Sequence, residues 1–141
     1  MEDLILPGVR VLLVEDSYDT REGIRVLLKQ HGAEVTAVAS AEEAMGAFPE
    51  VRPHVLLSDI GLGGGAADGC ELLRSVRALG ADAGGDVPAA AITAYGTDEH
   101  RIRALKAGFW DYVCKPVDTE LLVNVVAAVV RSAASRPLWK K

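Results

Sequence analysis

The stretch VRVLLVED, residues 9–16, decides the fold, because it joins a buried strand to two carboxylates. Residues 9–14 are apolar at every position but one and contain three Val residues. Such a composition is typical of a strand that is covered on both faces of a parallel sheet. Glu15 and Asp16 follow at once. In open parallel sheets, functional groups gather at the carboxyl ends of the strands, so this pair marks a candidate site.

Strand and helix signals alternate along the rest of the chain. The predicted strands are residues 9–14, 34–38, 55–59, 88–93 and 110–114. The predicted helix starts are Asp19, Ser40, Asp68, Thr97 and Asp118, of which Asp19, Ser40 and Asp68 have a Glu three positions later, the capping-box spacing. Gly32 and Gly108 are the expected ends of the first and fourth helices. Residues 80–86 are predicted to be a loop.

Apolar residues at helical spacing predict the inward faces of the helices. The first helix would bury Ile24 and Leu28, and the third would present Leu72, Leu73, Val76 and Leu79 on one side. The last helix carries a broad apolar stripe made of Leu121, Leu122, Val125, Val126, Val129 and Val130.

This alternation predicts the α/β class, with a doubly wound, five-stranded parallel sheet in (βα)5 order. Its crossovers are expected to be right-handed, with helices on both faces. A chain of 141 residues fits one domain, residues 1–141, with a core at about residues 8–131 and a tail at 132–141.

Composition excludes several classes of function. The formal net charge of −5 argues against duplex nucleic acid as a partner. Cys70 and Cys114 have no metal-ligand spacing and suggest a reducing compartment. No apolar run approaches the roughly 20 residues of a membrane span. The N-terminus lacks the basic start of a signal peptide, so a cytoplasmic location is expected.

Polar side chains end four of the predicted strands. They are Glu15 with Asp16, Asp59, Thr93 and Lys115. Taken alone, an acidic pair is usually the polar edge of a loop and a Lys at a strand end is usually solvated. Together, however, these residues would converge on one rim of the sheet. Two carboxylates about 4 Å apart repel by about 4 kcal/mol at an effective dielectric near 20, so such a cluster persists if a cation occupies it or if one acid holds a proton. Hard oxygen ligands favour Mg²⁺, for which Mn²⁺ could substitute.

Asp59 is the candidate nucleophile of this rim. A carboxylate beside Mg²⁺ can attack phosphorus and form an aspartyl phosphate. Lys115, the Thr93 hydroxyl and the Ala94 backbone N–H would stabilise the phosphoryl oxygens. Gly61 leaves room for its backbone carbonyl to reach the metal. A cis peptide bond before Pro116 would aim Lys115.

These residues, in this order and at these separations, resemble the response-regulator receiver domain of two-component signalling. The phrases VLLVEDS (11–17), SDIGL (58–62), AITAYG (91–96) and AGFWDYVCKPV (107–117) carry the resemblance, which spans about residues 8–131. It implies a flavodoxin-like receiver fold. It further implies that Asp59 accepts a phosphoryl group from the phosphohistidine of a histidine kinase or a histidine phosphotransfer domain. The domain would then be a phosphoacceptor in a phosphorelay, not a turnover enzyme.

The resemblance also assigns roles to the other residues. Asp16, Asp59 and the Gly61 carbonyl would bind Mg²⁺ directly, and Glu15 through water. Lys115 and Thr93 would hold the phosphoryl oxygens. Thr93 and Tyr95 would form the switch: as Thr93 moves toward the phosphoryl group, the Tyr95 ring turns inward. The face formed by the fourth helix, the fifth strand and the fifth helix would then change shape. Members of the family often dimerise there, so a homodimer is a candidate assembly.

Two departures from the family pattern stand out. The stretch 63–69 is about two residues longer than usual and lacks Pro, which bears on dephosphorylation and kinase docking. Trp110 occupies a position that is often small or acidic in the family. It is either an ordinary half-buried residue or a contact with a partner, since aromatic residues are favoured at binding hot spots.

Two alternatives to a working phosphoacceptor were weighed. A pseudo-receiver that serves only as an interaction module is disfavoured, because the acids, the hydroxyl and the Lys are all present. A phosphohydrolase would need a second Asp two residues after Asp59, where Gly61 stands. The sequence does not distinguish a stand-alone regulator from the receiver part of a hybrid histidine kinase, and it does not identify the cognate kinase, the output or the lifetime of the phosphoryl group.

Overall fold

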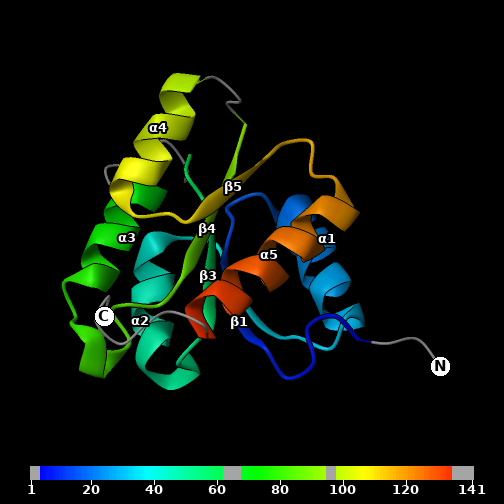
Figure 1. The fold of residues 1–141 in the computed structure, drawn as a ribbon, viewed down its shortest axis with the longest axis horizontal. Coiled ribbons are helices and arrows are strands. Elements are labelled where there is room, and N and C mark those ends of the chain that lie inside the picture. The colour runs from blue at the N-terminus through cyan, green and yellow to red at the C-terminus, as the bar shows by residue number, and fades with distance from the viewer. Residues whose placement is uncertain (1–3, 62–67, 95–97, 135–141) are drawn as a thin grey trace.

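The computed structural model describes residues 4–61, 68–94 and 98–134, and it shows a sheet with helices on both faces (Figure 1). The strands are β1 (Arg10–Val14), β2 (Glu34–Val38), β3 (Val55–Asp59), β4 (Ala89–Thr93) and β5 (Asp111–Cys114). The helices are α1 (Tyr18–Gln30), α2 (Ala41–Val51), α3 (Gly69–Arg77), α4 (Asp98–Ala107) and α5 (Thr119–Ala134). All strand pairs are parallel, in the order β2-β1-β3-β4-β5. The predicted fold class is confirmed.

Two apolar cores lie on opposite faces of the sheet. Val11 and Leu13 of β1 join the core beneath α1 and α5, whereas Leu12 and Val14 join the core beneath α2, α3 and α4. This division follows from strand geometry, since successive side chains point to opposite faces. The central strands β1, β3 and β4 are therefore apolar at nearly every position, as parallel sheets covered on both sides require.

The helix starts agree with the predicted caps at three of the sites. The side chains of Ser40, Asp68 and Asp118 each accept a hydrogen bond from the backbone N–H three residues later. The capping box at Asp19 is wrong: α1 begins at Tyr18, after Ser17, and Asp19 lies inside the first turn. There its negative charge still favours the positive end of the helix dipole. The expected start at Thr97 lies outside the described residues.

Two predicted core residues are instead exposed. Leu79 is 41% exposed because α3 ends before it, at Arg77. Leu121 is 51% exposed because it lies on the outward side of the first turn of α5. The predicted loop at 80–86 contains a short 3₁₀ helix, η1 (Ala81–Ala83). Among the described helices, none is both long enough and apolar enough to span a membrane.

The strand order brings the predicted site residues to one rim. β1 lies between β2 and β3, so the strand order reverses between β1 and β3. In open parallel sheets the functional site lies at the carboxyl ends of the two strands that flank such a reversal. Val14 pairs with Ser58, which makes Glu15 and Asp59 the next residues on neighbouring strands. Thr93 pairs with Cys114 on the other side, immediately before Lys115. The pairing register of the strands therefore brings these site residues together at one rim.

The loop after β3 is closed at its base by a tight backbone contact. Gly69 donates a hydrogen bond from its N–H to the Ile60 carbonyl, 3.0 Å away. A Cβ atom at Gly69 would lie 2.3 Å from the Asp59 carbonyl oxygen and 2.9 Å from the Ile60 Cα. Only glycine allows the start of α3 to approach the Asp59 backbone this closely.

We expect Gly69→Ala to lower the free energy of unfolding by about 1–3 kcal/mol, because backbone atoms must move to admit the methyl group. Gly46→Ala in α2 is the matched control, since a Cβ there meets nothing within 4 Å. The control should raise the free energy of unfolding by about 0.5–1 kcal/mol, because alanine favours helix. Urea denaturation measures both, and equal effects of the two substitutions would contradict the close approach.

Candidate functional site

Lys115 links two acids at the carboxyl edge of the sheet. Its Nζ donates hydrogen bonds to Glu15 Oε1 and to Asp59 Oδ2, each 2.9 Å away. Both acids are buried, whereas the Lys115 side chain remains 25% exposed. The three residues come from the ends of β1, β3 and β5, so the arrangement depends on the whole sheet. Burial of two carboxylates around one ammonium leaves the group with a net negative charge when all three are ionised.

The carboxylate of Glu15 is buried without a full set of hydrogen-bond partners among the described residues. Its side chain is fully buried, and Oε2 has no hydrogen-bond partner within the described part of the chain. Burial, together with the neighbouring Asp59, raises the pKa of Glu15 to about 7, although Lys115 opposes the shift. An orphaned, buried carboxylate oxygen is costly, and such a group accepts either a proton or a cation.

Asp59 is held in its ionised form. Burial acts to raise its pKa, but the interactions with Glu15 and Lys115 and the Gly61 N–H outweigh it, so the pKa lies below the ordinary value. The Gly61 N–H donates to Oδ1 at 2.9 Å. Ser58 is also buried, and its hydroxyl donates to the Asp59 backbone carbonyl at 3.0 Å. A fixed, ionised carboxylate is the form that a nucleophile requires.

Asp16 completes an acidic cluster that can hold a metal ion. One carboxylate oxygen from each of Glu15, Asp16 and Asp59 lies within 4.8 Å of the others. Asp16 is exposed, whereas Glu15 and Asp59 are buried, so the cluster opens to solvent on one side. Three hard oxygen donors, one of them the orphaned side chain of Glu15, fit a divalent cation that keeps several waters.

The remaining predicted residues surround this cluster. Thr93 is buried at the end of β4, and its carbonyl accepts from the Lys115 N–H at 2.7 Å, which ties the ends of β4 and β5 together. Ala94 is exposed immediately after Thr93. The Lys115–Pro116 peptide bond is cis. Tyr95 and most of the loop at 63–69 lie outside the described residues, so the predicted switch and the loop stay predictions.

Trp110 lies away from this rim. It is half-buried just before β5, packs against the core beneath α5, and donates from its backbone N–H to the Ala89 carbonyl at 2.7 Å. Trp110 also lines a hollow together with Arg77 and Asp86. A partner contact at Trp110 therefore remains a prediction about a second surface.

Sequence reasoning missed two features of the site. Gly61 was expected to contribute its carbonyl, but the contact that the structure describes is from its N–H to Asp59. Arg21 was not considered, yet its guanidinium donates to the Glu15 backbone carbonyl at 3.0 Å and so holds the end of β1. Neither contact has a sequence motif, because both depend on how the β1–α1 and β3–α3 connections turn.

The chain belongs to the response regulator receiver domain family, whose model matches residues 11–127. It is 40% identical over 121 residues to an uncharacterised 14.6 kDa protein in the sodA1 3′ region of Leptolyngbya boryana, covering 86% of this chain and 89% of that protein. It is 35% identical to regulatory protein VanRB of Enterococcus faecalis, covering 91% of this chain and 55% of VanRB. The chain thus spans about half the length of that regulator.

Solved structures show the same fold. The receiver domain of the Francisella response regulator 1452 superposes with a TM-score of 0.79 at 22% identity, over 89% of this chain and 99% of that one. The chemotaxis response regulator CheY4 of Vibrio cholerae gives a TM-score of 0.78 at 24% identity, over 86% and 98% of the two chains. At these identities the likeness establishes the flavodoxin-like receiver architecture.

The raised pKa of Glu15 predicts a pH-dependent stability in the absence of divalent cations. Between about pH 4.5 and about pH 7 the folded chain keeps a proton on Glu15 that the unfolded chain has lost. The free energy of unfolding should therefore fall as the pH rises through this window, by up to about 3 kcal/mol from this group. Glu15→Gln cannot ionise, so its stability relative to the wild type should increase over the same range.

Urea denaturation with a chelator present, at a series of pH values, measures this difference. Glu50→Gln, at an exposed position late in α2, is the control and should stay parallel to the wild type. A constant difference between Glu15→Gln and the wild type from pH 5 to pH 8 would show that Glu15 ionises freely in the folded chain.

Proposed function

We propose that this receiver domain is a phosphoacceptor, in which Asp59 takes a phosphoryl group from the phosphohistidine of a histidine kinase or a histidine phosphotransfer domain. The observation that carries the proposal is the contact of Lys115 Nζ with both Glu15 and Asp59 at 2.9 Å, beside a Glu15 oxygen that lacks a partner. An ion pair that only stabilised the fold would need a single acid for the single ammonium of Lys115. Here a second buried acid is present, and one of its oxygens lacks a partner among the residues that the structure describes.

Glu15, Asp16 and Asp59 would hold Mg²⁺, with the Gly61 carbonyl as a further ligand and Mn²⁺ as a substitute. When bound, Mg²⁺ supplies positive charge that offsets the phosphoryl oxygens. The cluster already contains more acid than Lys115 can neutralise, and this excess supports a dication as its partner.

The transfer step follows from the chain's own residues. An ionised Asp59 oxygen attacks phosphorus, a new O–P bond forms, and the P–N bond to the donor histidine breaks with its electron pair returning to the imidazole. Lys115 moves its hydrogen bond from the Asp59 carboxylate to a phosphoryl oxygen. The Thr93 hydroxyl and the Ala94 N–H bind the other oxygens. Thr93 ends β4 and Lys115 directly follows β5, so the sheet places these donors beside Asp59.

The consequence of transfer is a change of surface. Thr93 moves toward the phosphoryl group, Tyr95 turns inward, and the face made by α4, β5 and α5 shifts between two states. Each domain accepts one phosphoryl group at Asp59 and therefore acts as a phosphoacceptor, not as a turnover enzyme. The proposed upstream partner is the kinase or phosphotransfer protein. A homodimer through the face made by α4, β5 and α5 is a further proposed assembly. The proposed location is the cytoplasm.

Incubation with Mg²⁺ and acetyl phosphate tests the proposal. Intact-protein mass spectrometry should detect the mass of one added phosphoryl group on the wild type and none on Asp59→Asn, because the amide cannot act as the nucleophile. Chelation of Mg²⁺ should also abolish the addition.

Asp82→Asn, in the exposed η1 segment, is the matched control and should label like the wild type. Labelling of Asp59→Asn would assign the acceptor to another residue. A wild-type chain that stays unlabelled, although it binds Mg²⁺, would favour the interaction module without phosphate chemistry.

A further inference from the structure

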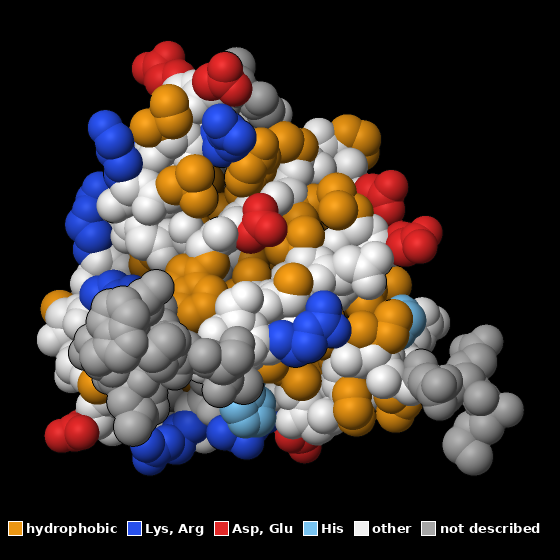
Figure 2. Space-filling view, viewed as in Figure 1, with side chains coloured by type: hydrophobic (Ala, Val, Ile, Leu, Met, Phe, Trp, Pro, Cys, Tyr) orange, Lys and Arg blue, Asp and Glu red, His pale blue; other side chains and the backbone are white. Residues whose placement is uncertain are grey.

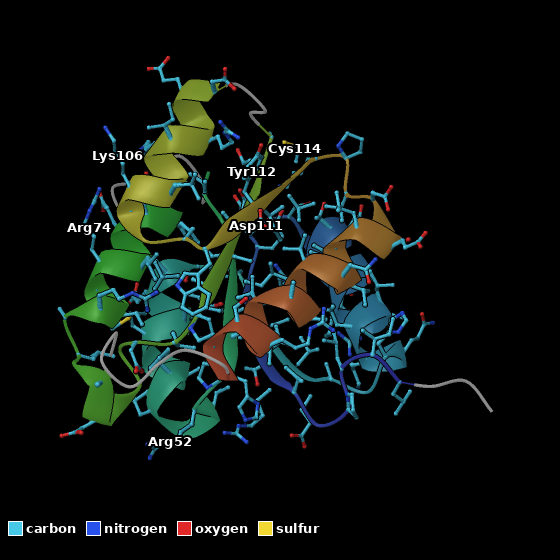
Figure 3. All side chains as sticks on the ribbon, in the orientation of Figure 1. Arg52, Arg74, Lys106, Asp111, Tyr112 and Cys114 are labelled. Carbon is cyan, nitrogen blue, oxygen red and sulfur yellow. The ribbon has the colours of Figure 1, made fainter. Side chains whose placement is uncertain are left out.

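A basic hollow lies between α3 and α4, on the flank of the molecule away from α5. It encloses about 420 Å³ and is lined by Arg74, Glu99, Ile102, Arg103, Lys106 and Ala107. Figure 3 shows Arg74 projecting from α3 and Lys106 from α4 on the same edge, and Figure 2 shows Lys and Arg side chains along that edge. None of these residues contributes to the Asp59 site.

The charge of this hollow is opposite to that of the whole chain. The chain carries a formal net charge of −5, yet the hollow is lined by three cationic side chains and by one acid, Glu99. Arg74 and Lys106 are exposed, and neither forms an ion pair with another residue in the described ranges. A local concentration of one sign attracts a partner of the other sign and speeds its association.

The helix dipole explains only part of this pattern. Arg74 and Lys106 lie in the last turns of α3 and α4, where a positive charge favours the helix on its own account. The dipole does not explain why two helices turn these charges toward one hollow. It also does not explain Ile102, which is 45% exposed at the same place.

The apolar residues Ile102 and Ala107 favour one kind of anionic ligand over others. An inorganic phosphate or a nucleic acid backbone gains nothing from an apolar lining, whereas a peptide can bring carboxylates and an apolar side chain together. An exposed Ile beside unpaired cations fits an acidic segment that carries an aliphatic residue among its carboxylates. The open shape of the hollow fits a chain segment better than an enclosed small molecule.

Arg103 connects the hollow to the base of the loop after β3. Its guanidinium donates to Asp68 Oδ2 at 2.5 Å, and the other Asp68 oxygen, Oδ1, caps α3. The next residue, Gly69, packs against the Asp59 backbone. An acidic segment in the hollow would compete with Asp68 for Arg103. Its binding would therefore change the contacts of Asp68, which directly precedes Gly69 beside the Asp59 backbone.

We propose that the hollow between α3 and α4 is a docking surface for an acidic, aliphatic-bearing segment of a partner protein, bound by Arg74, Arg103 and Lys106 with Ile102 as its apolar contact. This surface shares α4 with the face made by α4, β5 and α5, but its other wall is α3. The proposal does not depend on phosphorylation of Asp59, since all of its residues lie outside the acidic cluster.

The probe is a short synthetic peptide that repeats Asp-Glu-Leu-Glu, added to the full isotope-labelled chain with a chelator and without a phosphodonor. Backbone amide shifts in NMR spectra should move at α3 and α4, and the dissociation constant follows from the titration. Arg74→Glu with Lys106→Glu should weaken binding by about tenfold or more, because each exposed ion pair is worth a factor of a few and reversal adds repulsion. Binding should also weaken between about 0.1 M and about 0.5 M salt.

Arg101→Glu is the matched control, since Arg101 is exposed on α4 but does not line the hollow. It should bind like the wild type, and Ile102→Ser should bind less tightly. A peptide that repeats Asp-Glu-Ser-Glu should also bind less tightly. Equal loss in Arg101→Glu and in the double variant would reduce the effect to net charge and overturn the proposal. Shifts confined to other elements would do the same, as would equally tight binding of single-stranded DNA at these residues.

Discussion

The repulsion among three carboxylates at one edge of the sheet is the constraint on which the rest of this structure depends. Two such charges about 4 Å apart cost about 4 kcal/mol at an effective dielectric near 20, so the folded chain must supply compensation. Lys115 supplies part of it, through hydrogen bonds to Glu15 and Asp59, yet burial together with Asp59 still raises the pKa of Glu15 to about 7. The cluster therefore favours uptake of a further positive charge, and Asp59 is kept ionised within it.

The fold and the membership of the cluster could be predicted because both follow from chain order. Strands that alternate with helices must lie parallel, and parallel strands deliver Glu15, Asp59, Thr93 and Lys115 to a single rim. Which acid has the raised pKa, and the hydrogen bond from the Gly61 N–H to Asp59, could not be predicted, since the first depends on burial and the second on the turn after β3. The start of α1 was misplaced because Ser17 and Asp19 are both residue types that are favoured at a helix N-cap, and the helix begins after the first of them.

The helices divide the surface into regions with different physical characters. The rim that carries Glu15, Asp16 and Asp59 is acidic, and the hollow between α3 and α4 has the opposite charge. Asp68 and Gly69 lie between the two regions, since Asp68 bonds to Arg103 of α4 and Gly69 packs against the Asp59 backbone. The start of α3 is thus in contact with both Asp59 and the hollow, and a displacement at either one would change its contacts.

The most direct test of the central claim is the stoichiometry of Mg²⁺ binding by isothermal titration calorimetry. If the rim is an incompletely neutralised acidic cluster, the wild type should bind one ion per chain, and Asp16→Asn should bind it at least about tenfold more weakly, because one negative charge is lost from the ligand set. Asp19→Asn, which removes an exposed carboxylate outside the cluster, should bind Mg²⁺ like the wild type. Absence of Mg²⁺ binding, or equal binding by Asp16→Asn and the wild type, would contradict the account.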